Sequence, residues 1–216
     1  MTFSLGSTPR SLVKYNDQSI SAITEVGSGA GVTDDMVLIK EVTASSDSTI
    51  DFVDGTSDVV LDSTYPIYLF KFINIHNQTS AKYLQFNVSI DGGSNYNVAK
   101  TSTHFRAYQY ENDGGTALEY SGGDDLAQGT GAQHIGQDIG VNNDDTTAGF
   151  LHLFNPSDTT FVKHFIARTS NCVSTPTAQD AFTAGYINTT SAVDAIQFSI
   201  SSGNMDAGDI CLYGIA

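Results

Sequence analysis

A chain of 216 residues with nine Lys and Arg against 24 Asp and Glu carries a formal net charge of −15. That charge repels phosphate backbones and anionic lipid surfaces, so we expect neither nucleic acid nor a membrane as a direct partner. The 12 Phe, 10 Tyr and 20 Gly, with no Trp, favour strands and turns over helices.

The first 31 residues differ from the rest of the chain. They show neither the alternation of a strand nor strong helical periodicity, and they end in the glycine-rich segment Gly27-Ser-Gly-Ala-Gly31. We expect residues 1–31 to form an irregular N-terminal arm and link that orders against something else, and residues 32–216 to form a β-sandwich domain.

The first strands of that domain follow directly. Apolar and β-branched residues predict strands at Met36–Val42, Thr49–Val53 and Val59–Leu61. The dipeptide Asp54-Gly55 predicts a tight turn between the last two.

The most apolar segment is Ile67–His76. It is apolar on both faces for most of its length, which is typical of a central strand covered on both sides. The next segment, Lys82–Ile90, alternates cleanly between apolar and polar residues, as a half-buried strand does. The turn residues Asn77–Ser80 join the two, so we expect a hairpin.

A weaker alternation and a long polar segment come next. Ser102–Glu111 predicts an edge or partly exposed strand, with Phe105 and Ala107 on one face. Residues 112–148 are rich in Gly, Asp, Asn, Gln and Thr and contain few apolar residues. We expect them to be a long irregular segment that is functional or ordered by a neighbour.

Strand patterns then resume. Gly149–Phe154 and Thr160–Arg168 predict a second hairpin around the turn Asn155–Asp158, followed by an irregular segment, Thr169–Asp180. Further strands are predicted at Ala181–Ile187, Ala195–Ser201 and Asp209–Ile215. The glycines at 203 and 208, between the last two, suit a hairpin or a bulge.

About ten strands with turns at short intervals favour an all-β fold, an antiparallel β-sandwich. A jelly roll is favoured over an immunoglobulin-type fold, because the Cys and Trp pattern of the latter is absent. The residues that alternate inward on the cleanest strands form the predicted core: Leu84, Phe86, Val88, Ile90, Phe161, Phe165, Ile196, Phe198, Ile200 and Leu212.

The sequence contains no recognisable catalytic apparatus. It has no GxSxG, HExxH or phosphate-binding glycine loop. Its glutamates, Glu25, Glu41, Glu111 and Glu119, leave few acid pairs for glycoside hydrolysis. We therefore expect a protein that is not an enzyme, with no catalytic, cofactor-binding or metal-binding residues.

Several residues have a sharper interpretation beside the ordinary one. His152 and His164 could approach a metal across a hairpin, but single strand histidines usually pack or lie at edges. The best calcium candidates are the pairs Asp34-Asp35, Asp124-Asp125 and Asp144-Asp145, although none fits a calcium-binding loop and solvated turn residues are commoner.

The tyrosines and cysteines also allow two interpretations. Tyr108, Tyr110 and Tyr120 could build a platform for stacking a sugar or binding a protein, or they could cover the edge of the sandwich. Cys172, in an expected loop, and Cys211, in the last expected strand, form no disulfide framework.

Four segments carry a resemblance to a known family. They are Tyr65-Pro-Ile-Tyr-Leu-Phe-Lys-Phe-Ile-Asn-Ile-His76, Leu84-Gln-Phe-Asn-Val-Ser-Ile-Asp-Gly-Gly-Ser-Asn-Tyr96, Leu151-His-Leu-Phe-Asn-Pro156 and the C-terminal stretch 195–215. These resemble structural proteins of tailed bacteriophages, especially phages of marine and freshwater bacteria, over most of residues 35–216. The resemblance implies a virion protein on a β-sandwich that decorates the capsid or forms part of a tail or fibre. It transfers no catalytic residue.

We therefore expect a non-enzymatic virion structural protein, made in the bacterial host cytoplasm and assembled with other capsid or tail proteins. The alternative is a carbohydrate-binding module for host-surface glycans, and a glycan-degrading enzyme comes third. We also expect a homo-oligomer. Residues 1–31 and parts of 112–148 bury too little apolar surface on their own chain to offset an ordering entropy of about 1–2 kcal/mol per residue. The expectation of a trimer rests on the resemblance.

Overall fold

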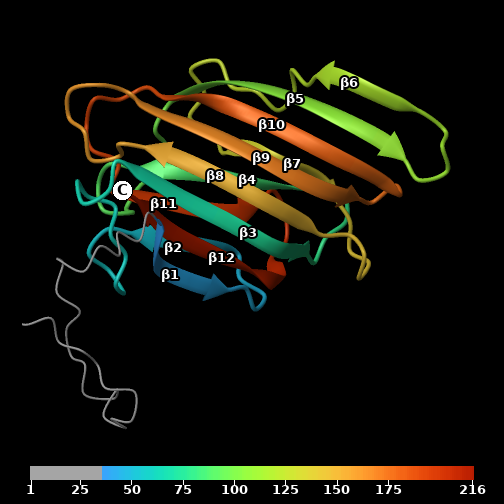
Figure 1. Cartoon of the computed structure of the whole chain (residues 1–216), viewed down its shortest axis with the longest axis horizontal. Helices are drawn as coiled ribbons and strands as arrows, with labels where there is room; N and C mark the ends of the chain where they lie inside the picture. The colour runs from blue at the N-terminus through green and yellow to red at the C-terminus, as the bar shows by residue number, and fades with distance from the viewer. Residues whose placement is uncertain (1–35) are drawn as a thin grey trace, which may run out of the picture. The chain divides into compact units, whose positions relative to one another are not determined.

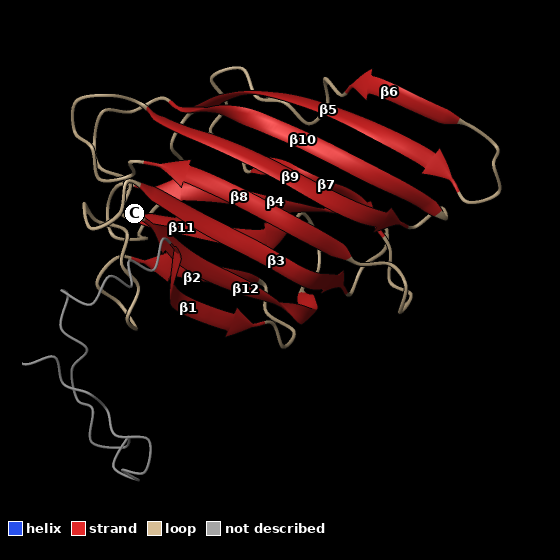
Figure 2. Cartoon of the chain, viewed as in Figure 1, coloured by secondary structure: helices blue, strands red, loops and turns tan. Residues whose placement is uncertain are grey.

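The computed structural model of the chain describes residues 36–216. Antiparallel strands form the regular structure of this part, which contains no helix and so no helix able to span a membrane (Figure 2). The arm expected at residues 1–31 lies outside the described residues. The strands are β1 (Met36–Thr43), β2 (Thr49–Val53), β3 (Ile67–Asn77), β4 (Lys82–Ser89), β5 (Lys100–Tyr110), β6 (Thr116–Tyr120), β7 (Gln133–Ile139), β8 (Thr147–Phe154), β9 (Lys163–Val173), β10 (Thr177–Ile187), β11 (Ala195–Ile200) and β12 (Met205–Ile215).

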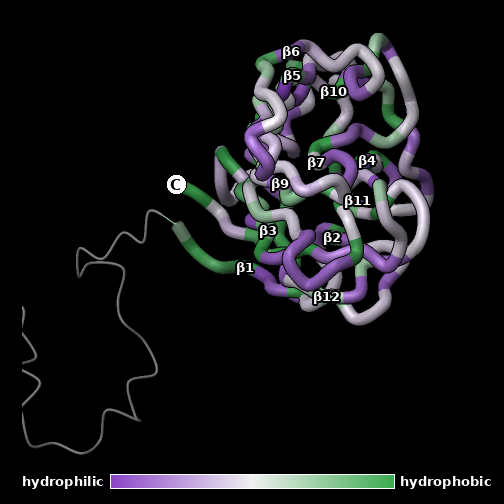
Figure 3. Tube along the Cα trace, turned by 90° about the vertical axis from the view of Figure 1, so that its right-hand side faces the viewer, coloured by the Kyte–Doolittle hydropathy of each residue, from purple (hydrophilic) through white to green (hydrophobic). Residues whose placement is uncertain are grey.

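Two layers of strands make a jelly roll. One layer has the order β1-β12-β3-β8 and the other the order β2-β11-β4-β7. The links β1–β2, β3–β4, β7–β8 and β11–β12 each cross from one layer to the other, as in a double-sheet jelly roll. Figure 3 shows the two layers edge-on. The all-β, jelly-roll-like sandwich predicted from the sequence is confirmed.

The remaining strands widen one layer only. They continue the first layer beyond β8 in the order β9-β10-β5-β6, so that one long sheet runs from β1 to β6 (Figure 1). We call this the large sheet, the layer β2-β11-β4-β7 the small sheet, and the strands β9, β10, β5 and β6 the extension. The two sheets meet at one edge through the pair Ile139 and Val173.

The core fills the space between the two sheets. Phe52, Phe70, Phe86 and Phe198 are fully buried, and the Phe198 ring lies 5.2 Å from the Phe70 ring and 6.1 Å from the Phe52 ring, centroid to centroid. Of the predicted core, these members are buried: Leu84, Phe86, Val88, Phe165, Ile196, Phe198, Ile200 and Leu212.

Two predicted core residues are exposed. Ile90, 42% exposed, follows the end of β4, and Phe161, 70% exposed, precedes the start of β9. The strand alternation that was extended to these positions stops one or two residues short of each. Both assignments were therefore wrong at strand ends, where the pleat no longer fixes the direction of the side chain.

The expected hairpin of Ile67–His76 with Lys82–Ile90 is not formed. The first segment is β3, which pairs with β12 and β8, and the second is β4, which pairs with β11 and β7. The turn between them carries the chain across to the other sheet, so that both strands point their apolar side chains into one core from opposite sides. The second expected hairpin, β8 with β9, is confirmed.

Other boundaries also differ from expectation. Val59–Leu61 is not a strand, although Val59 and Leu61 are both buried. The Asp54 carboxylate holds this turn by accepting a hydrogen bond from the Leu61 amide at 2.8 Å. Residues 112–148 contain β6, β7 and the start of β8 rather than a long irregular segment. Most of Thr169–Asp180 belongs to β9 and β10, and this places Cys172 in a strand. β5 lies between β10 and β6, so it is not an edge strand, but it is partly exposed, which was the other expectation for it.

Gly208 lies at a bulge within β12. Gly208 has a φ of 103°, and a Cβ at this position would lie 2.5 Å from the carbonyl oxygen of Asn74. The register between β12 and β3 shifts at Ala207 and Asp209. Only glycine fits this close approach of two backbones without strain.

Candidate functional site: an apolar sheet face and a polar groove

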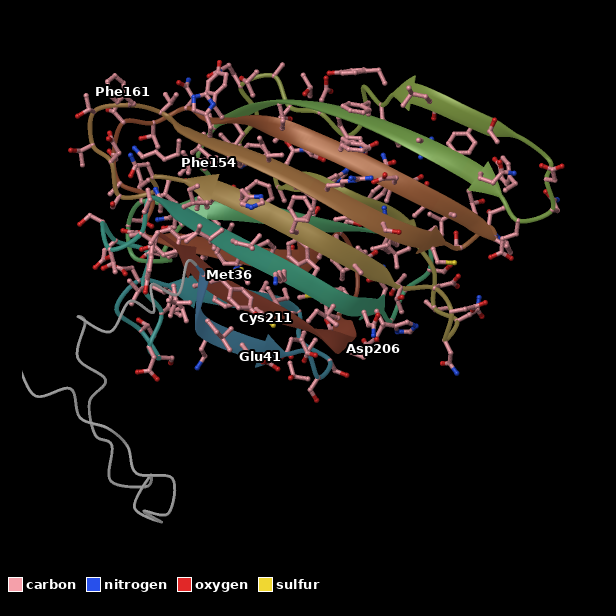
Figure 4. All side chains as sticks on the ribbon, in the orientation of Figure 1. Met36, Glu41, Phe154, Phe161, Asp206 and Cys211 are labelled. Carbon is pink, nitrogen blue, oxygen red and sulfur yellow. The ribbon has the colours of Figure 1, made fainter. Side chains whose placement is uncertain are left out.

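The large sheet has two unlike sides, because successive side chains of a strand point to opposite sides. The inner side faces the small sheet, and Figure 1 looks onto the other side. We call that other side the outer face. Figure 4 shows its side chains in the same view, with Met36, Phe154 and Cys211 labelled on β1, β8 and β12.

One transverse row of the outer face joins the strands of the extension to β8. The register places Tyr120 opposite Phe105, Phe105 opposite Phe182, Phe182 opposite Arg168, and Arg168 opposite Phe150. The Phe105 and Phe182 rings are stacked, with centroids 4.8 Å apart and 5° between their planes. We call these five residues the aromatic row. Directly opposed pairs of this kind stabilise a sheet and at the same time hold their rings in a fixed array.

Arg168 is held rigidly within the aromatic row. Its Cζ lies 4.7 Å from the centroid of the Phe182 ring. Its Nε and Nη2 donate to the Asp180 carboxylate at 3.0 and 2.7 Å. An arginine that is fixed by a carboxylate and stacked on a ring has already lost much of its rotamer freedom, so binding through it loses less entropy.

The outer face is hollowed beside the row. A depression of 580 Å³ lies between Phe150, Arg168 and Asp180, and small residues contribute to its lining: Ala107, Ala148, Gly149, Ser170 and Ala178. A second depression of 250 Å³ is lined mainly by apolar side chains, among them Ile166 and the stacked phenylalanine pair. The two depressions could accept protruding side chains of a partner.

Most of the large apolar side chains that the described residues expose lie on this outer face. Leu118 is 73% exposed and Ile166 is 48% exposed. The full set on this side is Met36, Leu38, Ile73, Phe105, Leu118, Tyr120 and Ile166; Ile90, Val141 and Phe161 lie elsewhere.

Behind the extension, the inner side is polar. Asp124 is buried and accepts hydrogen bonds from His134 Nδ1 at 2.8 Å, from Ser121 Oγ at 2.5 Å and from the side-chain amide of Gln137. Burial alone would raise the pKa of Asp124, but the hydrogen bonds from His134 and Ser121 outweigh it and lower the pKa. We call this region the polar layer.

Arg106 of β5 connects the polar layer to its rim. Its Nε donates to Glu119 at 2.8 Å, and its Nη1 donates to Gln137 at 3.0 Å and to Gln179 at 3.3 Å. The positive charge of Arg106 is therefore paired with Glu119 on the inner side of the sheet. The amide oxygens of Gln137 and Gln179 accept further hydrogen bonds from the same guanidinium group.

A buried lysine lies at the other end of the same strand. Lys100 is fully buried, and its Nζ donates to Asn87 Oδ1 at 2.5 Å and to the carbonyl of Val98 at 3.0 Å. Burial lowers the pKa of Lys100 to about 8, because no carboxylate accompanies the ammonium group.

A polar groove of 360 Å³ opens where β7 ends beside the turn between β9 and β10. It is lined by Ala81, Arg106, Tyr108, Tyr110, Asp138, Val173, Ser174, Thr175, Thr177 and Gln179. The rings of Tyr108 and Tyr110 lie edge to face, 5.6 Å apart. Since Tyr108 and Tyr110 alternate with Phe105 and Ala107, the groove and the aromatic row belong to opposite sides of β5.

The three tyrosines singled out in the sequence do not form one platform. Tyr108 and Tyr110 line the polar groove, whereas Tyr120 lies on the outer face and donates its hydroxyl to Asp125 at 2.5 Å. The sugar-stacking and protein-binding interpretations therefore fall on two different surfaces, one on each side of the extension.

The histidine pair shares a face but not a site. His152 and His164 both point to the outer face, but the register sets His152 opposite Ile166. The His152 ring lies 5.1 Å from the Phe150 ring and 6.1 Å from the Phe154 ring, so it packs among aromatics. No cluster of three or more His, Cys, Asp or Glu side chains that could hold a metal occurs among residues 36–216.

Of the four acid-pair carboxylates that the structure describes, three have protein partners. Asp124 accepts within the polar layer and Asp125 accepts from Tyr120. Asp145 accepts from the backbone amide and the side chain of Asn142 at 3.0 and 2.7 Å. The pair Asp34-Asp35 lies outside the described residues.

The outer face is the feature that the sequence interpretation missed. Its signal was present in Ile67–His76, whose second apolar side was taken to be covered within the fold. In the structure Phe70 and Phe72 are buried in the core, while Ile73 on the other side is 43% exposed. A strand that is apolar on both sides can thus leave part of its second side exposed: Leu69 on this side of β3 is buried, whereas Ile73 is not.

Comparison of the chain with protein-family models, with curated proteins and with solved structures finds no match.

Proposed function

We propose that this chain is a non-enzymatic structural protein of a tailed-phage virion, which decorates the capsid or forms part of the tail or fibre, and that it assembles through the outer face. The observation that carries the proposal is that face, where stacked rings and large aliphatic side chains remain exposed on the single chain. Soluble monomers rarely expose contiguous apolar patches beyond a few hundred Å², and larger patches mark interaction sites.

The chemistry of the outer face suits a protein partner. Aromatic residues and arginine dominate the centres of protein interfaces, and the aromatic row consists of both. The charge of the aromatic row is paired within the chain, because Arg168 donates to the Asp180 carboxylate on the same side of the large sheet. A contact over this row would therefore add little to the repulsion between copies of a chain with a net charge of −15.

The fold supports the proposal by analogy only. Double-sheet jelly rolls serve as viral capsid domains, lectins and other proteins, so the fold is compatible with several functions. The resemblance to phage structural proteins narrows the choice. The proposed partners are other virion proteins and further copies of this chain, most simply as a homotrimer. The chain would be made in the host cytoplasm and reside in the virion.

The test compares two apolar positions that are almost equally exposed but lie in different places. Leu118→Lys changes the outer face at a side chain that is 73% exposed, and Phe161→Lys changes a side chain that is 70% exposed in the loop before β9. Light scattering of the purified chains and mass spectrometry of purified particles give the readouts. Leu118→Lys, alone or with Ile166→Lys, should reduce the oligomer and the copies per particle, whereas Phe161→Lys should change neither. Equal behaviour of the two variants, or absence of the chain from particles, would contradict the proposal.

Carbohydrate binding is the second candidate function, and the polar groove with its two tyrosines favours it. The two functions are compatible, because the groove and the aromatic row belong to opposite sides of β5. A virion protein that is attached through its outer face would keep the groove free to bind a glycan of the host surface.

A further inference from the structure

We propose that the polar groove binds a neutral saccharide, with a sugar ring against Tyr108 or Tyr110 and sugar hydroxyls on Asp138 and Thr177. This inference rests on the second candidate function and is independent of the role of the outer face. The volume of the polar groove, 360 Å³, falls within the range of small-ligand sites, about 300–1,000 Å³.

The most specific observation is an unpartnered hydroxyl. Thr177 is 4% exposed, and its Oγ1 has no hydrogen-bond partner within the chain, although it lines the groove. Buried polar atoms in proteins are nearly always paired, so an orphan at the wall of a groove needs a partner from outside the chain, either water or a ligand, and we infer a ligand hydroxyl here. Thr177 also lies directly opposite Tyr110 in the register of β10 and β5, and this brings the hydroxyl beside an aromatic ring.

A second observation concerns the backbone. Asp138 and Ala81 both line the groove, and both have left-handed backbone conformations, with φ values of 51° and 56°. Seven other non-glycine residues among residues 36–216 also have a positive φ, most of them in loops and turns, so this conformation fixes the local geometry of the groove and does not by itself indicate a ligand. The conformation at Asp138 helps to set the direction of its side chain, which is 41% exposed.

The groove combines the groups that sugars require. A sugar ring presents C–H groups on its faces and hydroxyls around its rim, so its recognition needs an aromatic surface together with planar acceptors and donors. Tyr108 and Tyr110 provide the aromatic surface. Asp138 provides a carboxylate, which can accept from two hydroxyls, and Gln179 provides an amide.

The charges select neutral sugars. Arg106 supplies the positive charge that lines the groove, but its Nη2 already lies 2.7 Å from the Glu119 carboxylate. Its Nη1 lies 3.8 Å from the Asp138 carboxylate. Two carboxylates therefore surround one guanidinium, and an anionic sugar such as a sialic or uronic acid would add a third negative charge. The net charge of −15 of the whole chain acts in the same direction.

The test uses saturation-transfer NMR and a tyrosine fluorescence titration of the full chain, which contains no Trp. Glucose, galactose, N-acetylglucosamine and maltotriose are the neutral probes, and glucuronic acid and N-acetylneuraminic acid are the anionic probes. At least one neutral probe should bind, and the anionic probes should bind more weakly. Tyr110→Ala should lower the affinity for the neutral probe about tenfold or more, whereas the matched variant Tyr120→Ala, on the outer face, should leave it unchanged.

Thr177→Val separates a binding role from a structural one. Valine fills the same space without the hydroxyl, so a ligand-binding role predicts an affinity lower by about fivefold with an unchanged or higher Tm. A purely structural role predicts a lower Tm. If Tyr110→Ala fails to fold, Asp138→Asn takes its place, because asparagine tolerates the left-handed backbone.

Three results would overturn the inference. They are no binding by any neutral probe, tighter binding of the anionic probes, and neutral binding that is indifferent to both Thr177→Val and the Tyr110 or Asp138 variant. None of these results affects assembly through the outer face, which the Leu118 and Phe161 variants test separately.

Discussion

The jelly roll and its extension distribute apolar side chains in opposite ways. Between the large and small sheets the jelly roll buries a cluster of rings around Phe198, with Phe52, Phe70 and Phe86. In the extension, the inner side of β5 carries Lys100, Ser102, His104 and Arg106, and the apolar side chains point out. The jelly roll therefore buries its ring cluster within the chain. The four strands of the extension bury Phe165 but expose Phe105, Leu118, Tyr120 and Ile166, whereas the eight strands of the jelly roll expose Met36, Leu38 and Ile73.

This difference assigns separate tasks to the two regions. The aromatic core provides the apolar burial that stabilises the fold. The polar layer holds the extension in place by hydrogen bonds, which are directional and fix its geometry. Phe105 and Tyr120 of the extension remain exposed on the single chain, and we propose that a partner covers them. Substitution of a phenylalanine should thus have a large effect on folding in the core of the jelly roll and a small effect on the outer face of the extension.

The largest effect is expected in the core. Phe198→Ala removes a ring that packs against Phe70 and Phe72 at centroid distances of 5.2 Å each, and it should lower the free energy of unfolding by about 3–5 kcal/mol. Urea unfolding followed by circular dichroism measures the change. A loss below about 1 kcal/mol would mean that the aromatic cluster is not the main core.

The next effect concerns Lys100 and the pH. Its folded pKa of about 8 lies below its ordinary value of 10.5, so between these values the unfolded chain holds a proton that the folded chain has released. This contribution to stability is complete above about pH 10.5 and is lost as the pH falls through about 8. The free energy of unfolding should rise by roughly 2–3 kcal/mol over this window. Cysteine and tyrosine groups with raised pKa values titrate in the same window with the opposite sign, so the Lys100 contribution is measured as the difference between the wild type and Lys100→Met. A difference that stays the same from about pH 8 to pH 10.5 would contradict the assignment.

A smaller effect with the same direction in pH is expected in the polar layer. The folded pKa of Asp124 lies below its ordinary value of 3.8, so its contribution is present above that value and is lost as the pH falls through the folded pKa. Asp124→Asn should lower stability at neutral pH by about 1–2 kcal/mol and should have less effect at pH 2. Urea unfolding of the wild type and of Asp124→Asn at neutral pH and at pH 2 measures the difference. An equal loss of stability at the two pH values would show that the charge of the Asp124 carboxylate does not stabilise the polar layer.

The smallest effect on folding is expected on the outer face. Phe105→Ser removes a ring that is 40% exposed and stacked on Phe182, so the isolated chain should lose about 1 kcal/mol or less. The same change should weaken assembly. A loss comparable with that of Phe198→Ala would show that the aromatic row stabilises the monomer and would weaken its role as an interface.

The sequence places most strands near their observed positions: β1 through β4, β8, β11 and β12 in the jelly roll, and β5 in the extension. It misses β6 of the extension and β7 of the small sheet. β7 was missed because its buried Gln133 and Gln137 are satisfied by hydrogen bonds, and such residues look like a solvated loop in a linear pattern. The alternation in β5 was recognised, but alternation alone does not say which side of a strand is inward.

Pairing between strands was harder to predict than the strands themselves. The turn after β3 has a composition that suits a hairpin, but it links two sheets, because the choice depends on which strands complete each layer. The polar groove could not be found from the sequence for the same reason. It joins Tyr110 and Thr177, which are neighbours only through the register of β5 and β10, with Asp138 from β7.

We propose that a partner covers the outer face in the assembled state. Hydroxyl-radical footprinting with mass spectrometry compares the labelling of Leu118, Ile166 and Phe105 in the isolated chain and in purified particles, with Phe161 as the exposed internal control. We expect the three outer-face residues to be strongly protected from labelling in particles and the labelling of Phe161 to stay unchanged. Equal labelling of the outer face in both states, with the chain present in the particles, would contradict it.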